Sequence, residues 1–314
     1  MKARYVVDVH AHLGASPSIE TIAESVHSAK DWPTTRTKHP QEFAKIPTER
    51  QTDNSETLLE VMDRHGVTHA LIQSLPVQPP PGEGTELVAA AAKKHKDRLF
   101  PLYRPDFFLV SVGMGKMSGD PEVLAENSRR VVDDIERKFP ELGFIGHGEI
   151  LPSLVTREID PAKISQAMRP MMEALQAKNA PIQIATSYTG MKGNLYYGDP
   201  LWVDELAGDF PQVPIVLVKM GRGFNRFFEA CLVVALRNAN VFLETTNASP
   251  QHVRVAIDKL GPQRIMFGTD LHEVSKQYCY DEEFATMRSA NVTDDEWEWI
   301  GWRTANEVYK LGLN

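Results

Sequence analysis

The chain has 314 residues, of which 42% are hydrophobic and 24% charged, a composition typical of globular proteins with a large buried core. The formal net charge is −8 and no Lys/Arg-rich run occurs, so we predict no nucleic-acid partner. No apolar run is long enough to cross a bilayer, the first residues do not resemble a signal peptide, and two distant cysteines make no disulfide framework. We therefore predict a cytoplasmic protein without a membrane partner.

Short apolar segments alternate with longer amphipathic ones along the chain. The predicted strands cover residues 5–10, 68–73, 99–103, 144–150, 182–185, 215–218, 241–244 and 265–268. The predicted helices cover residues 56–65, 86–95, 121–139, 161–178, 200–210, 227–237 and 249–260. Near-continuous apolar strands separated by helices indicate a parallel sheet covered by helices on its outer face.

Eight strands of this kind predict an α/β fold of the (β/α)8 TIM-barrel type, with the whole chain, residues 1–314, as a single domain. A doubly wound open sheet is the alternative. Residues 14–55, between the first strand and the first helix, are expected to form an insertion that serves as a lid or a partner contact. Residues 273–314 are expected to add helices whose tryptophans pack on the barrel, or else on a second subunit of a homodimer.

Polar or charged side chains follow all eight predicted strands, where the active site of a barrel lies. They are His10 and His12, Gln73 and Ser74, Arg104, His147 and Glu149, Thr186 and Tyr188, Lys219 and Arg222, Glu244 and Thr245, and Asp270 and His272. This pattern predicts a polar pocket above an apolar core.

The sequence Asp8-Val9-His10-Ala11-His12 ends the first strand. In an extended strand Asp8, His10 and His12 share one face, so two imidazoles could bind one ion at about 2.0–2.1 Å. Asp270 ends the eighth strand, which neighbours the first in a closed barrel, and could ligate the same ion and accept a proton. The alternatives are histidines that only form hydrogen bonds and an aspartate that caps a turn.

Several stretches are similar to the amidohydrolase superfamily, in the amidohydrolase-related branch that includes aminocarboxymuconate-semialdehyde decarboxylase, resorcylate-type decarboxylases and various hydrolases. They are residues 7–12 (VDVHAH), 58–63 (LLEVMD) followed by 66–67 (GV), 210–211 (FP) before 216–218 (VLV), 220–221 (MG), 265–270 (IMFGTD) and 305–311 (ANEVYKL). The resemblance covers nearly the whole chain, and the first and last strand motifs are its most specific parts.

The resemblance implies that His10 and His12 are metal ligands and that Asp270 is a ligand or a base. The chain departs from the family at two positions. Ala185 or Thr186 stands where the family has a metal-binding histidine after the fifth strand, and Lys219 stands where it has another after the sixth. We therefore expect a single divalent ion, zinc, rather than a binuclear site, with a barrel that binds no metal as the alternative.

Glu149 is our candidate for a further ligand, and a salt bridge to Lys219 or Arg222 is the equal alternative. Lys219 has several possible roles: it could supply charge in place of a metal, bind a substrate carboxylate, act as a base or amine nucleophile, or be carboxylated into a ligand. We favour the charge or carboxylate-binding role, and place Lys219 with Asp270 among the catalytic residues.

The predicted substrate-binding residues are Arg104, His147, Tyr188, Arg222 and His272. Arginines in such a pocket suit bidentate binding of a carboxylate, whereas a surface guanidinium, core packing and a solvated loop histidine are the ordinary alternatives. Together these residues predict a metal-dependent hydrolase of an ester, lactone or amide in a small carboxylate substrate. A non-oxidative decarboxylase, a metal-independent lactonase, a catalytically silent ligand-binding barrel and a scaffold remain alternatives.

Overall fold

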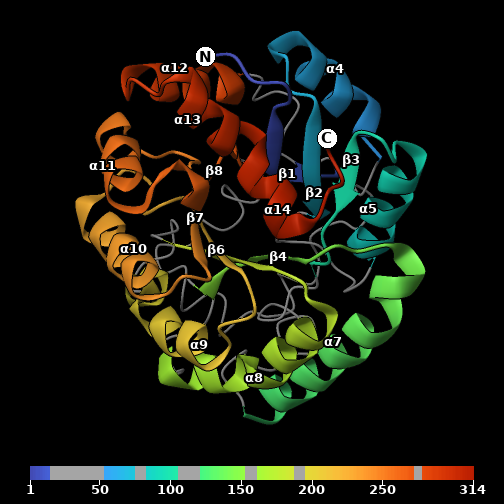
Figure 1. Cartoon of the computed structure of the whole chain (residues 1–314). Helices are drawn as coiled ribbons and strands as arrows, with labels where there is room; N and C mark the ends of the chain where they lie inside the picture. Colours follow the sequence, from blue (N-terminus) through green and yellow to red (C-terminus); the bar gives the residue numbers. More distant parts are fainter. Residues whose placement is uncertain (15–52, 75–82, 105–120, 153–160, 187–194, 272–277) are drawn as a thin grey trace, which may run out of the picture.

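Eight parallel strands surrounded by helices make up the computed structural model, which describes residues 1–14, 53–74, 83–104, 121–152, 161–186, 195–271 and 278–314 (Figure 1). The strands are β1 (Val7–Leu13), β2 (His69–Ser74), β3 (Leu99–Pro101), β4 (His147–Ile150), β5 (Ile182–Ala185), β6 (Ile215–Val218), β7 (Val241–Glu244) and β8 (Ile265–Met266). The helices of the ring are α4 (Ser55–His65), α5 (Glu83–Lys94), α7 (Pro121–Leu142), α8 (Pro161–Lys178), α9 (Val203–Asp209), α10 (Asn225–Arg237) and α11 (Pro250–Leu260). The predicted TIM-barrel class is confirmed.

The strands form two parallel sheets, one with the order β1-β2-β3 and one running from β4 to β8. Continuous pairing between strands does not extend around the whole barrel. Isolated bridges join the sheets at both seams, between Tyr103 and His147 and between Ala11 and Leu271. At the second seam the backbone N–H of His12 donates to the carbonyl of Leu271 at 2.7 Å, which brings the ends of β1 and β8 together.

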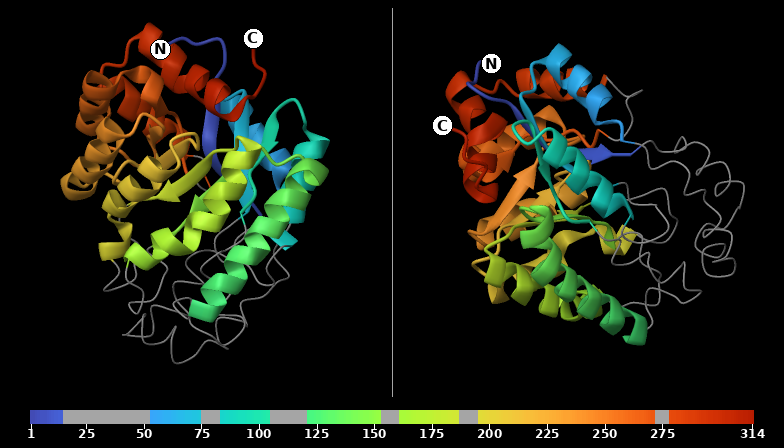
Figure 2. Two further views of the ribbon diagram at one scale, coloured as in Figure 1. Left: turned by 60° about the horizontal axis from the view of Figure 1, so that its bottom comes forward. Right: turned by 90° about the vertical axis from the view of Figure 1, so that its right-hand side faces the viewer.

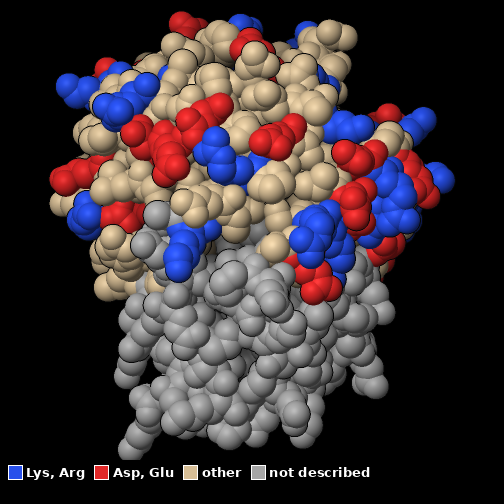
Figure 3. All heavy atoms as spheres, turned by 90° about the horizontal axis from the view of Figure 1, so that it is seen from below, with Lys and Arg blue, Asp and Glu red and all other residues tan. Residues whose placement is uncertain are grey.

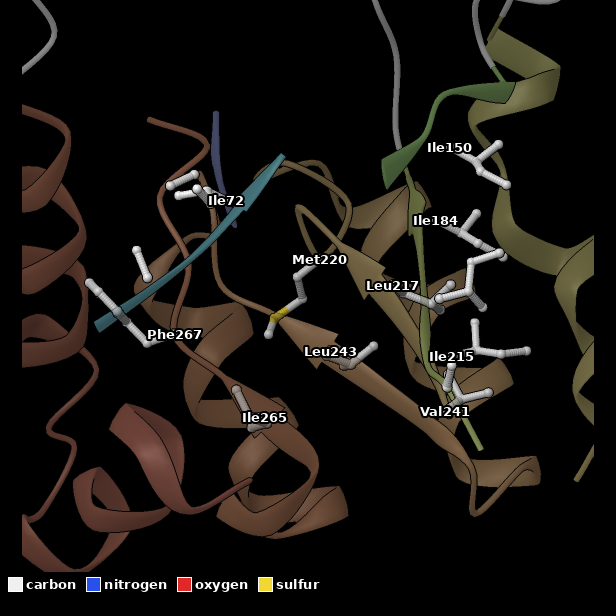
Figure 4. Close-up of a cluster of buried hydrophobic side chains, with 14 of the residues drawn as sticks. Ile72, Ile150, Ile184, Ile215, Leu217, Met220, Val241, Leu243, Ile265 and Phe267 are labelled. Carbon is white, nitrogen blue, oxygen red and sulfur yellow. The ribbon is translucent and has the colours of Figure 1, made fainter. Parts of the chain in front are cut away.

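Two apolar layers hold the barrel together. Inside, Val7 of β1, Val216 of β6 and Met266 of β8 form one buried cluster. Outside, side chains such as Ile215 and Leu243 pack between the strands and the helices (Figure 4). Strands buried on both faces explain why the sequence reads as continuous apolar runs rather than alternating ones.

The helix ends follow ordinary capping chemistry. Helix α4 buries Leu58, Val61 and Met62 and ends at Gly66, whose φ of 70° is readily adopted by glycine. Helix α11 begins after Ser249, whose side chain accepts a hydrogen bond from the backbone of His252. The helix predicted over residues 200–210 is divided, because the turn Pro200–Trp202 is a 3-10 helix and α9 begins only at Val203.

The C-terminal segment folds as α12 (Tyr278–Ser289), α13 (Asp294–Glu298), a π-helical turn and α14 (Thr304–Tyr309), and α14 crosses the barrel in Figure 1. Trp297 packs edge-on against Phe267 at 5.3 Å between ring centroids, and Trp302 packs on Tyr5 at 5.2 Å. These tryptophans therefore contact the barrel itself. Both termini lie at the same end of the molecule (Figure 2).

The predicted insertion over residues 14–55 lies almost wholly outside the described residues. Among the described helices, none combines the length and apolar character that crossing a membrane requires. On the face shown in Figure 3, Lys and Arg alternate with Asp and Glu over the described surface, so this face does not present an extended basic area.

Candidate metal centre

Four side chains from three strand ends converge at one point. His10 and His12 come from β1, Glu149 comes from β4, and Asp270 lies four residues beyond the end of β8. One ligand atom from each lies within 4.8 Å of all the others. Asp270 Oδ1 lies 3.0 Å from His12 Nε2 and 3.4 Å from His10 Nε2, so the two imidazoles and the distant carboxylate meet as the sequence analysis predicts.

The separations suit a tetrahedral ion. Glu149 Oε2 lies 3.7 Å from His10 Nε2 and 3.8 Å from His12 Nε2. With metal–ligand bonds of about 2.0–2.1 Å, two ligand atoms of a tetrahedral ion lie about 3.3–3.4 Å apart. The four imidazole–carboxylate separations, from 3.0 to 3.8 Å, bracket that value, and two imidazoles with two carboxylates form a donor set that zinc accepts.

Hydrogen bonds on the other ring nitrogens leave both Nε2 atoms directed at this point. His10 Nδ1 lies 3.2 Å from Glu244 Oε2, and His12 Nδ1 lies 3.0 Å from the carbonyl of Ser74. Each oxygen can accept the Nδ1 proton, so a neutral ring that binds an ion would present the lone pair of Nε2 to it. Because His10 Nε2 is buried and has no hydrogen-bond partner among the described residues, it fits a metal ion.

Asp8 does not share the face of the two histidines, contrary to the expectation from simple alternation. The register of β1 shifts between Asp8 and Ala11. Val7 and Val9 lie in the interior cluster, whereas Ala11 lies in the outer one, so the bulge reverses which side chains point inward. Asp8 instead accepts hydrogen bonds from Thr269 and from Tyr280 of α12.

Lys219 joins the two carboxylates from the other side. Its Nζ lies 2.7 Å from Glu149 Oε1 and 2.8 Å from Asp270 Oδ2. Each carboxylate therefore has one oxygen on the lysine and the other facing the imidazoles. For Glu149, the salt bridge and the ligand role are both possible at once, since they use different oxygens.

The charges explain the protonation of the site. Burial and Lys219 lower the pKa of His10, but Asp270 and Glu149 outweigh them and raise it to about 9 in the metal-free protein. Burial lowers the pKa of His12 to about 4. Burial alone would raise the pKa of both carboxyl groups, yet the cations hold both below their ordinary range. Burial would lower the pKa of Lys219, but the two carboxylates raise it.

A strained turn carries Lys219. From Lys219 to Gly223 five consecutive residues have positive φ, with values of 71°, 37°, 76°, 53° and 77°. Asp270 also has a positive φ, of 53°. Such backbone costs on the order of 1–3 kcal/mol for each non-glycine residue and persists where the surrounding structure imposes it, commonly at functional sites.

Arg104 is placed as an anchor of Glu149 rather than as a group open to a substrate. It is 5% exposed, and its Nε donates to the carbonyl of Glu149 at 2.7 Å. Its Nη1 donates to the carbonyl of Ser74 at 3.0 Å, and its Nη2 approaches Glu149 Oε2 at 3.5 Å. The guanidinium thus ties together the ends of β2 and β4.

His147 does not join the cluster. Its ring packs edge-on against Tyr103 at 5.6 Å, and the hydroxyl of Tyr103 donates to Asp134 of α7. Tyr103 also contacts Phe139 and Phe144, so the imidazole lies on the helix-facing side of β4. The predicted substrate-binding role of His147 therefore has no support in its position.

Of the remaining predicted substrate-binding residues, Arg222 is half-buried in the turn after β6, three residues after Lys219. Tyr188 and His272 lie outside the described residues.

Glu244 is a site residue to which the sequence analysis gives no role. Its Oε2 accepts from the backbone N–H of Lys219 at 2.9 Å as well as from His10, and its Oε1 accepts from the hydroxyl of Thr246 at 2.6 Å. A Cβ on Gly268 would lie 2.3 Å from Glu244 Oε1, so a glycine there lets the carboxylate fit. Its place at the end of β7 is the signal that the sequence offers for it.

Fold and cluster together define a barrel with histidines and carboxylates at its strand ends that could hold a metal ion. The sequence profile of the family described as amidohydrolase matches residues 116–311, more than half of the chain. The chain belongs to the amidohydrolase family, and the predicted recognition is confirmed. The protein is therefore an enzyme of that superfamily. Comparison with curated proteins finds no match.

Solved structures share the fold over the full length. They include 5-carboxyvanillate decarboxylase from Sphingomonas paucimobilis, with a TM-score of 0.62, 16% identity, and coverage of 98% of this chain and 99% of that one. A 2,6-dihydroxybenzoate decarboxylase has a TM-score of 0.63, 16% identity and complete coverage of both chains. The 4-oxalomesaconate hydratase from Rhodopseudomonas palustris has a TM-score of 0.63, 14% identity, and coverage of 98% and 96%.

Proposed function

We propose that the protein is a hydrolase that uses one divalent ion, zinc, to cleave an ester, lactone or amide in a small carboxylate substrate. The observation that carries this proposal is the convergence of His10, His12, Glu149 and Asp270 within 4.8 Å, with both Nε2 atoms facing the two carboxylates. When bound there, a divalent ion supplies Lewis-acid chemistry, which polarises a carbonyl oxygen or lowers the pKa of water.

The side chains of the chain divide the remaining work. His10, His12, Glu149 and Asp270 would hold the ion, with Glu244 and the carbonyl of Ser74 fixing the rings through their Nδ1 atoms. The side chain of Asp270 is 18% exposed, whereas those of the other three are at most 2% exposed, so Asp270 borders the open side of the site. Its Oδ1 would accept the proton of the attacking water.

A substrate carboxylate would be bound by a cationic side chain near the strand ends. Lys219 pairs with two carboxylates and Arg104 with the end of β4, so neither is the first choice for a substrate carboxylate. We assign this role to Arg222, which is half-buried in the turn after β6, because a guanidinium can bind a carboxylate with two parallel hydrogen bonds.

A non-oxidative decarboxylase is the second candidate. Lys219 holds Asp270 Oδ2 at 2.8 Å, and the cations around Asp270 keep its pKa low, which makes it a weak proton acceptor. Decarboxylation needs no attack by water. The 5-carboxyvanillate and 2,6-dihydroxybenzoate decarboxylases have the same fold, and a 5-carboxyvanillate decarboxylase variant from Novosphingobium aromaticivorans was solved with bound manganese.

A substrate panel on the protein loaded with zinc or manganese separates the two reactions. Carboxylate-bearing lactones and esters are assayed for acid release, and hydroxybenzoates for release of CO2. For hydrolysis we expect Asp270→Asn to lower kcat by about 10²–10⁴-fold. Asp258→Asn, on the exposed surface of α11, is the matched control and should leave kcat unchanged.

Release of CO2 without hydrolysis of any lactone or ester would replace the first proposal by the second. Hydrolysis at an unchanged rate by protein from which all metal has been removed would reject the metal-dependent mechanism.

A further inference from the structure

We propose that Lys219 occupies the position of a second metal ion, so that its ammonium group limits the centre to one ion. This inference rests on the proposed metal-dependent function, and concerns how many ions the site accepts. It follows from the position of one nitrogen atom relative to two carboxylates.

The first step of the argument is the sharing of oxygens. Glu149 and Asp270 each direct one oxygen to the imidazoles and the other to Lys219 Nζ, at 2.7 and 2.8 Å. Two carboxylates that face a pair of cations in this way are the arrangement expected of a two-ion site, whose ions lie about 3.5–4 Å apart. Here the second cation is a side chain of the chain itself.

The second step concerns ligands. A second ion would need donors besides the two outer oxygens. The fifth strand ends in Ala185, which offers none, and Thr186 is already engaged, since its hydroxyl donates to the carbonyl of Val218 at 2.8 Å and accepts from Gly221 N at 3.0 Å. Glu244 Oε2 is bound by His10 and by the backbone of Lys219.

The third step concerns rigidity. A lysine stem is flexible, and an ammonium on a mobile stem could yield to a competing ion. Lys219 is 6% exposed, its backbone N–H is bound to Glu244, and it opens the turn of five residues with positive φ. The ammonium group is therefore held in place by buried backbone and by two ion pairs.

The charge balance agrees with this role. Lys219 supplies one positive charge where a divalent ion would supply two, and the carboxylates of Glu149 and Asp270 are then shared between one lysine and one ion. A lysine also cannot leave the protein, so part of the buried negative charge stays compensated in the metal-free chain.

The test counts ions. Wild-type protein and the variants Lys219→His, Lys219→Gln and Lys219→Arg are saturated with Mn²⁺, and bound ions per folded chain are counted by native mass spectrometry. Electron paramagnetic resonance shows whether the manganese ions are isolated or coupled as a close pair. Histidine and glutamine remove the ammonium group and add a neutral ligand, whereas arginine keeps a cation and is the control.

We expect one ion in the wild type and in Lys219→Arg, with the spectrum of isolated Mn²⁺. We expect two ions and a coupled spectrum in Lys219→His and Lys219→Gln. Two ions in the wild type, two in Lys219→Arg, or one ion in both neutral variants would each overturn the inference while leaving the metal-dependent function intact. No ion in the wild type would overturn both.

Discussion

Glu244 shows how one buried carboxylate can control a centre that it does not touch directly. It accepts the Nδ1 proton of His10 and the backbone N–H of Lys219, so it fixes a proposed ligand and the turn that carries the ammonium group. It is fully buried, and its charge strengthens both hydrogen bonds. Partners of this kind typically change metal affinity by about 10–100-fold.

We therefore predict that Glu244→Gln weakens zinc binding by about 10–100-fold without unfolding the protein. The measurement is a competition titration against a coloured chelator, with circular dichroism to verify the fold. Glu298→Gln, at the half-buried end of α13, is the control and should bind zinc as the wild type does. Equal affinity in both variants would show that the Glu244 contact does not orient His10.

The raised pKa of His10 predicts a pH-dependent affinity. Ligation needs a neutral ring, and the pKa of about 9 means that the metal-free ring is protonated at pH 7. Apparent affinity should therefore rise about tenfold per pH unit from pH 7 to 9, with about one proton released per ion at pH 7. His12, with a pKa of about 4, is already neutral and adds nothing.

Calorimetric titration in buffers of different ionisation enthalpy counts that proton, and affinities that agree at pH 7 and 8.5 would contradict the prediction.

The stability of the metal-free protein should fall, rather than rise, over the same range of pH. Because the pKa of His10 is higher in the folded chain than the ordinary 6.5, its protonation stabilises the fold. This contribution is complete below pH 6.5 and disappears as the pH rises through about 9.

At the scale of elements, the turn between β6 and α10 holds the site against a helix. Gly221 has a φ of 76°, and a Cβ there would lie 2.4 Å from the backbone nitrogen of Phe228. Neither the backbone conformation nor the space allows a side chain. Because Lys219 lies two residues earlier, any shift of this turn also moves the ammonium group.

We predict that Gly221→Ala destabilises the protein by about 3 kcal/mol or more, since left-handed backbone and overpacking each cost about 1–3 kcal/mol. The matched control is Gly208→Ala in α9, where nothing lies within 4 Å and alanine should stabilise the helix by about 0.5–1 kcal/mol. Urea unfolding measures both. If Gly221→Ala unfolds at the same urea concentration as Gly208→Ala, the described turn geometry is wrong.

At the scale of the whole molecule, the proposed ligands connect β1, β4 and β8, which belong to both sheets and both seams. An ion bound there would link parts of the chain that otherwise meet through isolated bridges. Because it would bind the folded chain alone, it should stabilise the barrel by mass action.

Saturation with zinc at about 100 times its Kd should contribute about 2.7 kcal/mol, or a rise in Tm of about 4 °C for a chain of this length. Differential scanning calorimetry measures the shift. His10→Ala should abolish it, whereas His65→Ala, which removes an imidazole that pairs with Asp281 at α12, should retain it. A shift that survives His10→Ala would place the ion elsewhere.

Much of the fold and part of the site could be predicted, and the reasons differ by residue. Hydrophobic periodicity located all eight strands, since burial on both faces requires apolar runs. His10, His12 and Asp270 were predictable because closure of the barrel makes the first and last strands neighbours. Asp8 and His147 were misplaced, because a bulge in β1 and the orientation of β4 decide which side chains point inward.

The sequence by itself determined the barrel, the strand ends that bear polar groups and the candidate ligands. Only the tertiary structure decided that Lys219 bridges Glu149 and Asp270, that Arg104 anchors the backbone, and that Glu244 fixes His10. The physical reason is that periodicity encodes burial along one strand, whereas the pairing of charges depends on distances between strands far apart in the sequence.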